Sequence, residues 1–144
     1  MNHGAIFLDA LAQNEDDTPT RMIYADWLEE HGEYEEADRQ RQWPAAKAWL
    51  VGFCQQYNPT DEMIAEDPSY KEDVTSYASL IECGRQALKE ESDGQYYLNC
   101  GRNEDMCDDL RNSHSREFWR NWSVVTGVPL PENLEDRVHF HCAC

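Results

Sequence analysis

Apolar side chains recur at helical spacing along most of this 144-residue chain, and this periodicity restricts the fold more than any other feature. In the most apolar run, Trp49 and Phe53 stand four residues apart, as do Leu50 and Cys54. Such pairs share one face of a helix, so residues 45–54 are predicted to form a central buried helix. The same spacing predicts further helices at about residues 5–12, 19–31, 69–91, 104–112 and 115–126. Residues 33–42 also favour a helix, because acidic residues near the start and arginines near the end match the helix dipole.

Proline and glycine indicate where these helices begin and end. Pro44 predicts the start of a new helix, because proline is favoured at the first helical position and disrupts a helix interior. Thr18 is the predicted N-cap of the second helix. Gly32 and Gly127 predict C-terminal stops in the left-handed conformation. Gly84 lies inside a predicted helix and indicates a close approach by another backbone.

Two segments, residues 95–100 and 137–144, change to an alternating pattern that is typical of strands. A lone strand leaves its backbone groups without partners, so we expect the two to pair, with residues 104–126 crossing between them. The predicted fold is therefore mainly α-helical, with a small two-stranded β-sheet near the C-terminus. We divide the chain into an N-terminal helical segment, residues 1–57, and a segment with both strands, residues 58–144. The two can also form one continuous domain.

The N-terminal segment carries a longer motif. Residues 7–11 read FLDAL and residues 16–32 read DDTPTRMIYADWLEEHG, in which YADWLEE and the glycine that follows are the most specific part. Over about residues 4–42 the chain resembles the repeat-companion domain of planctomycete proteins, a family of unknown function. The resemblance implies a short helical module in a bacterial protein and implies no activity. That family continues with an acidic residue, two apolar residues and an arginine, where this chain has Asp38, Arg39, Gln40 and Arg41.

The chain carries 29 Asp and Glu residues against 12 Lys and Arg, a formal net charge of −17. Binding of nucleic acid or of an anionic membrane needs a basic surface, so this charge argues against both as direct partners. Apolar residues make up 40% and aromatic residues 11%, which is too rich for a disordered acidic tail. No segment reaches the ~20 apolar residues of a membrane span, and no apolar signal region follows Met1. We therefore expect a folded, cytoplasmic protein.

The second and third predicted helices hold the densest set of carboxylates. These are Asp26, Glu29, Glu30, Glu33, Glu35, Glu36 and Asp38. Carboxylates on rigid helices can present negative charge as a nucleic-acid backbone does. We therefore predict a non-enzymatic module that binds a protein partner with a basic surface, for example an inhibitor that occupies the partner's nucleic-acid groove. The other interpretation is that the charge serves solubility alone.

Six cysteines indicate an alternative function, a small structural zinc-binding module. Alternation places thiols at the ends of both predicted strands, so strand pairing would bring them together. A set of four thiolates is a ligand set that zinc prefers, and His139 or His141 offers a nitrogen ligand instead. Cys54 and Cys83 lie near apolar helix faces, and we expect them to be core thiols, which is also the other interpretation of the rest. The candidate ligands are Cys100, Cys107, Cys142 and Cys144.

No pattern in the sequence predicts catalysis. A nucleophilic cysteine needs a nearby histidine and a lowered thiol pKa, whereas Asp108 and Asp109 beside Cys107 would raise its pKa. The acidic doublets point in different directions on their helices, which is typical of solvated faces. The sequence has no glycine-rich phosphate loop and no Gly-x-Ser-x-Gly elbow. We therefore expect no enzymatic activity, and no cofactor apart from the zinc of the alternative.

Overall fold

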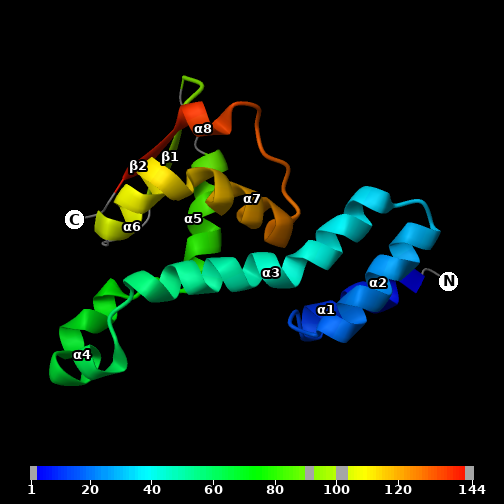
Figure 1. The fold of residues 1–144 in the computed structure, drawn as a ribbon, viewed down its shortest axis with the longest axis horizontal. Coiled ribbons are helices and arrows are strands. Elements are labelled where there is room, and N and C mark those ends of the chain that lie inside the picture. Colours follow the sequence, from blue (N-terminus) through cyan, green and yellow to red (C-terminus); the bar gives the residue numbers. More distant parts are fainter. Residues whose placement is uncertain (1–2, 90–92, 100–103, 142–144) are drawn as a thin grey trace.

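The computed structural model describes residues 3–89, 93–99 and 104–141. It confirms a mainly α-helical fold with a small two-stranded sheet near the C-terminus (Figure 1). In chain order the elements are α1 (His3–Gln13), α2 (Thr18–Glu30), α3 (Tyr34–Tyr57), α4 (Asp61–Glu66), the 3-10 helix η1 (Pro68–Asp73), α5 (Tyr77–Lys89), β1 (Tyr96–Asn99), α6 (Glu104–Asp109), the π-helical segment η2 (Leu110–His114), α7 (Ser115–Thr126), α8 (Leu134–Arg137) and β2 (Val138–His141).

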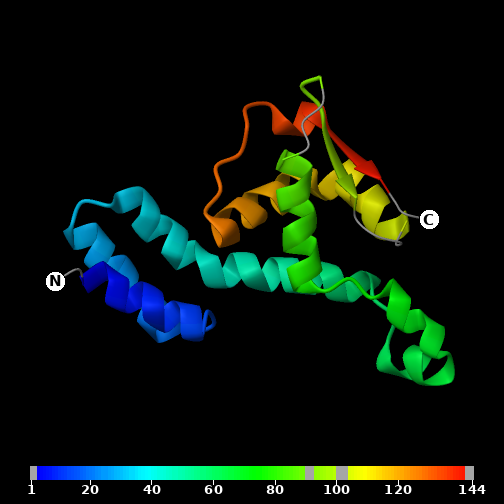
Figure 2. The same ribbon diagram turned by 180° about the vertical axis from the view of Figure 1, so that it is seen from behind.

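One long helix, α3, organises the fold. It runs without interruption from Tyr34 to Tyr57, so the prediction that a new helix begins at Pro44 is wrong. Pro44 has no N–H to donate to the carbonyl of Gln40, and α3 bends along its course (Figure 1). The helix packs against α2 near its start and against α7 and α5 farther along (Figures 1 and 2).

Two clusters of buried side chains lie along α3. The smaller one joins α1, α2 and the start of α3 and consists of Leu11, Tyr24, Leu28 and Ala37. The larger one joins the rest of α3 to α5, β1 and the helices that follow, and its bulkiest members are Phe118, Trp119 and Trp122. Leu50, Phe53 and Cys54 are buried in it, which confirms the predicted central helix.

Capping residues set the ends of α2 and α7. Asp17, and not Thr18 as predicted, is the N-cap of α2, because its carboxylate accepts a hydrogen bond from the Thr20 backbone N–H at 3.2 Å. Gly32 (φ +80°) and Gly127 (φ +73°) adopt the left-handed conformation after α2 and α7, as predicted.

The single helix predicted for residues 69–91 is wrong, since η1 ends at Asp73 and α5 begins only at Tyr77. The Asp67 side chain caps η1, which follows the short helix α4. Two hydrogen bonds join the Asn58 side chain, just after α3, to the backbone of Thr75, between η1 and α5. Asn58 Nδ2 donates to Thr75 O at 2.9 Å, and Thr75 N donates to Asn58 Oδ1 at 2.8 Å. No side chain of α4 or η1 is buried, and the two project from the rest of the molecule (Figure 2).

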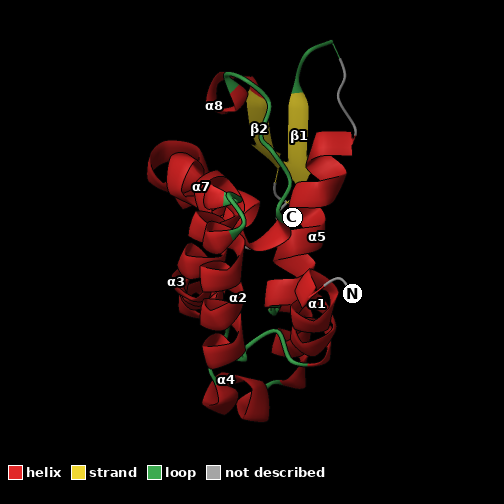
Figure 3. Ribbon diagram, turned by 90° about the vertical axis from the view of Figure 1, so that its right-hand side faces the viewer, coloured by secondary structure: helices red, strands yellow, loops and turns green. Residues whose placement is uncertain are grey.

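The two strands pair with each other, as predicted. They are parallel, with Tyr96 opposite Val138, and the chain between them crosses over through α6, η2, α7 and α8. The two helices predicted in this crossover are joined without a break by η2. Leu98 faces the core, whereas Tyr97 stacks on His139 with ring centres 5.2 Å apart on the outer face. The sheet lies at the end of the molecule away from α4 (Figure 3).

Gly84 on α5 lies against a side chain, so the predicted approach of another backbone is wrong. A Cβ atom at this position would lie 2.7 Å from Cε2 and 2.9 Å from Cδ1 of Trp122. The Trp122 indole is fully buried, and its Nε1 donates to the Ile81 carbonyl at 2.9 Å. Gly84 therefore makes room for the tryptophan that joins α7 to α5.

Replacing Gly84 with alanine is expected to lower the free energy of unfolding by about 1–2 kcal/mol. The added methyl group must displace Trp122, and overpacking of this kind costs more than the helix propensity that alanine gains. Denaturant unfolding followed by circular dichroism measures the change. Gly52→Ala is the matched control, because nothing lies within 4 Å of a Cβ there. It is expected to stabilise the protein by about 1 kcal/mol, and equal effects of the two variants would contradict the packing described.

Candidate functional site

Six of the seven carboxylates predicted to bind a partner are exposed. On α2, Glu29 and Glu30 stand three and four residues after Asp26, so each shares a side of the helix with it. The remaining exposed carboxylates are at the start of α3 and just before it. These are Glu33, Glu35 and Asp38.

Arg41 brings the acidic side of α2 next to that of α3. Its Nη2 lies 3.0 Å from Asp26 Oδ1 and 2.7 Å from Glu29 Oε2. The other four exposed carboxylates form no ion pair with any residue that the structure describes. Among the described residues, the positive charge of Arg41 is thus the one that pairs with any of these six negative charges. We call the six carboxylates and Arg41 the acidic face.

Glu36, the seventh predicted residue, is half-buried and is turned between the helices. It accepts hydrogen bonds from Arg39 Nη2 at 2.6 Å and from Gln40 Nε2 at 2.8 Å. Its carboxylate therefore serves the packing of the helices and does not belong to the acidic face.

A buried polar contact continues from this carboxylate to α2. Arg21 Nη1 donates to Gln40 Oε1 at 2.5 Å, and the two side chains are only 5% and 2% exposed. The Arg21 guanidinium also donates to the Glu15 carbonyl at 2.7 Å and lies 3.7 Å from the centre of the Trp43 ring. Buried charge is tolerated only with such partners. We call Arg21, Gln40, Glu36 and Arg39 the polar chain.

Sequence reasoning missed the polar chain, although one signal was present. Arg21 stands three residues before Tyr24 and four before Ala25, so it shares a helix face with two residues that the structure buries. An arginine on an apolar helix face indicates a buried partner, but the spacing does not identify Gln40 as that partner.

The polar chain also reaches α7. Arg39 Nη1 donates to the Val124 carbonyl at 2.6 Å, and Trp43 Nε1 donates to the Val125 carbonyl at 3.3 Å. Carbonyls in the last turn of a helix have no partner within it, and a cation is favoured there by the helix dipole. Side chains of α3 therefore cap α7 while the same polar chain holds α2.

Burial and the charges within the polar chain shift the pKa of Glu36 and that of Arg21. Burial by itself raises the pKa of Glu36, but the hydrogen bonds from Arg39 and Gln40 and the charge of Arg39 hold it below the ordinary value of 4.5. Burial lowers the pKa of Arg21, and the nearby charge of Arg39 acts in the same direction. An arginine guanidinium nevertheless stays protonated in proteins.

The structure places the cysteines in different surroundings. Cys54 is buried in the larger core, where burial and the neighbouring Cys83 raise the pKa of its thiol to about 11. Burial also raises the pKa of Cys83. Both are free thiols, and a raised pKa makes each a poor nucleophile.

Cys107 is buried and disulfide-bonded, and a sulfur in a disulfide is not a thiolate ligand. The other three predicted zinc ligands lie outside the described residues. Within the described part of the chain no three His, Cys, Asp or Glu side chains gather as a metal site would require. The zinc site stays a prediction, and it applies to the reduced chain.

The chain matches no protein-family model, no curated protein and no solved structure. The resemblance of residues 4–42 to the repeat-companion family therefore stays a prediction. Among the described residues, no helix is both long enough and apolar enough to cross a membrane.

Replacing Gln40 with methionine is expected to lower the free energy of unfolding by about 2–3 kcal/mol. Methionine keeps the length of the side chain but removes the acceptor for Arg21 and the donor to Glu36, and hydrogen bonds to charged groups contribute this much. Chemical denaturation measures the effect. Gln42→Met, on an exposed position two residues along α3, is the control and is expected to change stability by less than about 0.5 kcal/mol. Similar losses in the two variants would rule out a special role for Gln40.

The Glu36→Gln variant is expected to lose stability in a pH-dependent way. Because the pKa of Glu36 is lowered by folding, its charge stabilises the folded state above its ordinary pKa of 4.5, and this contribution is lost as the pH falls through the lower folded value. The difference in unfolding free energy between wild type and variant should be full at pH 7 and shrink steadily below about pH 4.5. A difference that does not change between pH 7 and pH 3 would contradict the pairing with Arg39.

Proposed function

We propose that this protein is a non-enzymatic binding module whose acidic face docks on a basic surface of a partner protein. The observation that carries the proposal is the arrangement of six exposed carboxylates on α2, at the start of α3 and just before it, where Arg41 is the one described residue that pairs with any of them. Four of the six, Glu30, Glu33, Glu35 and Asp38, form no ion pair with any described residue and are therefore available to an external partner.

The packing beneath the acidic face supports the same proposal. Arg21 and Gln40 fix α2 on α3, and Arg39 fixes α3 on α7. Lys47 adds a further link, since its Nζ lies 2.7 Å from both Glu15 Oε1 and Asp16 Oδ1 in the loop that precedes α2. Carboxylates on such a supported surface lose little backbone freedom when a partner binds, which favours affinity.

A nucleic-acid groove is the kind of basic surface that we propose as the target. Such a groove binds phosphates with lysine and arginine side chains, and carboxylates held on rigid helices can engage the same side chains. The module would then act as an inhibitor that excludes the nucleic acid. Charge complementarity of this kind gives rapid association that weakens as salt is added.

Neutralising four carboxylates of the acidic face is expected to abolish capture of the partner. The variant is Glu30→Gln, Glu33→Gln, Glu35→Gln and Asp38→Asn, and the control carries the same change in charge elsewhere, as Glu62→Gln, Glu66→Gln, Glu117→Gln and Glu132→Gln. Wild type, variant and control are used as baits in a bacterial lysate, and bound proteins are eluted with increasing salt.

The expected result is one basic nucleic-acid-binding protein that wild type and control retain and the variant does not. Its affinity for the purified variant should fall at least about tenfold at low salt, and duplex DNA or RNA should compete with wild type for it. Loss of capture by both charge variants would show that net charge alone is responsible. Capture that survives in the variant, or that nucleic acid does not compete with, would refute the proposal.

A further inference from the structure

A cavity of about 370 Å³ lies between α3 and α7. Residues of both helices line it, and these are Gln42, Ala45, Ala46, Trp49, Arg120 and Asn121. None of them belongs to the acidic face, and the cavity has no role in the function proposed above. Ligand pockets in proteins commonly have volumes of about 300–1,000 Å³, so this cavity is large enough for one small organic molecule.

The aromatic wall of this cavity is the half-buried side chain of Trp49. Phe53 stacks on the Trp49 ring, with the ring centres 5.1 Å apart and 7° between the planes, and Phe53 does not line the cavity. One turn before Trp49, α3 carries Ala45 and Ala46, whose methyl groups are too small to cover a ring. The Trp49 Nε1 donates to no described residue. The indole therefore keeps a flat apolar surface toward the cavity.

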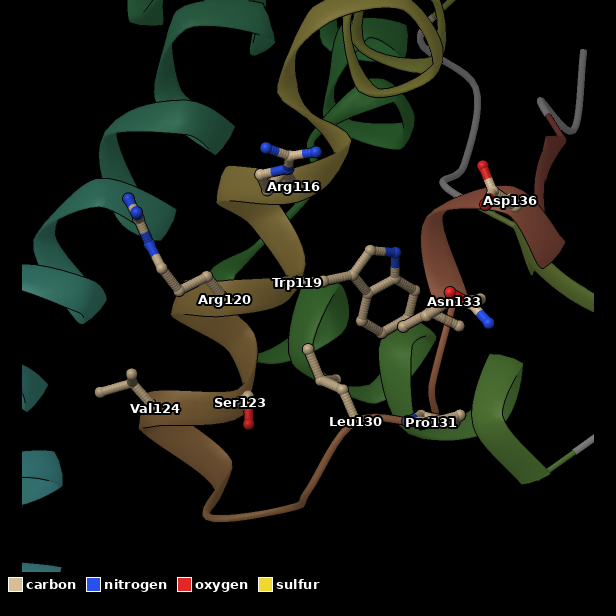
Figure 4. Close-up of a pocket in the computed structure, with 10 residues that line it drawn as sticks. Arg116, Trp119, Arg120, Ser123, Val124, Leu130, Pro131, Asn133 and Asp136 are labelled. Atoms are coloured by element: carbon tan, nitrogen blue, oxygen red, sulfur yellow. The ribbon is translucent and has the colours of Figure 1, made fainter. Parts of the chain in front are cut away.

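Arg120 brings a positive charge to the opposite wall. Figure 4 shows its side chain leaving α7 toward α3, whereas Trp119 points to the other side of α7. Arg120 is exposed and forms no hydrogen bond or ion pair with any described residue. It is also the one charged residue among those that line the cavity. A guanidinium without an internal partner is available to an anionic ligand.

We infer that the cavity between α3 and α7 binds a small aromatic carboxylate. The ring of this ligand lies against Trp49, and its carboxylate pairs with the guanidinium of Arg120. Aromatic rings stack favourably on an indole, and arginine binds a carboxylate through two parallel hydrogen bonds. The side-chain amides of Gln42 and Asn121, which also bond to no described residue, offer further donors and acceptors. A carboxylate adds a single negative charge, which suits a chain of net charge −17 better than the larger charge of a phosphate monoester.

Indole-3-acetate tests the inference, because it combines an aromatic ring with a carboxylate. The full chain, labelled with ¹⁵N, is titrated with this probe and, separately, with the neutral indole-3-acetamide, which has almost the same shape. The indole N–H signal of Trp49, assigned with the Trp49→Phe variant, reports on the cavity. We expect saturable binding of the carboxylate that shifts this signal, and binding of the amide that is weaker by at least about fivefold.

Arg120→Gln separates a specific contact from general charge. Arg120 is exposed, so the variant is expected to fold as wild type does, and it should bind indole-3-acetate at least about fivefold more weakly. Arg85→Gln, which removes an exposed arginine of α5, should bind as wild type does. Equal affinities of wild type for the carboxylate and the amide, or equal effects of the two arginine variants, would overturn the inference.

Ala45→Leu tests whether the probe occupies this cavity, because the larger side chain fills the space beside Trp49. Ala45 is exposed and leucine is a good helix former, so the variant is expected to fold and to lose saturable binding. Ala48→Leu, at an exposed position of α3 that does not line the cavity, should bind as wild type does. Wild-type affinity in Ala45→Leu, or no saturable shift in the wild-type protein up to about 10 mM probe, would also overturn the inference.

Discussion

The arrangement of the helices depends on the hydrogen bond between Arg21 of α2 and Gln40 of α3 and on the contacts that continue from it. Among the described residues, the apolar cluster between α1, α2 and α3 has four buried members, with Phe7 and Trp27 partly buried beside them, and this is a small core for three helices. The polar chain compensates, because it runs from the loop before α2 through Gln40 and Glu36 to Arg39 and the end of α7. The buried charge of Arg21 is costly without its partners, so loss of one contact is expected to weaken the others.

The bend of α3 lets one helix take part in two cores. Near its start the helix packs on α2 through Ala37, and after Pro44 it enters the larger core through Leu50 and Phe53. A helix broken at Pro44 would leave the two cores joined only by a loop. The continuous helix instead places Gln40, which bonds to α2, one turn away from Trp43, which bonds to α7. The acidic face is consequently held on the same framework as the larger core.

Local patterns predicted most of the helices and both strands, because caps, periodicity and alternation act within a few residues. Gly32 and Gly127 end their helices as the sequence indicates. Features that depend on distant residues were not predictable in the same way. Pro44 is tolerated inside α3 because tertiary packing outweighs a local cost, and Gly84 faces Trp122, which lies 38 positions later in the chain.

The candidate site shows the same division. Six of the seven predicted carboxylates are exposed, as is usual for charged residues on a helix surface, whereas Glu36 is turned inward by Arg39 and Gln40 of its own helix. Arg39 and Gln40 stand where the resemblance leads one to expect two apolar residues. In this chain the two residues belong to the polar chain, in which Gln40 accepts from Arg21 of α2 and Arg39 donates to the Val124 carbonyl of α7.

The central claim is that the polar chain makes α2, α3 and α7 one cooperative unit. Native-state hydrogen exchange of the wild-type protein tests it most directly, since it gives an opening free energy for each backbone amide. The account predicts that the slowest amides of α2 open with the same free energy as those of α7. Opening of α1 and α2 at a much lower free energy, while α5 and α7 remain protected, would contradict it.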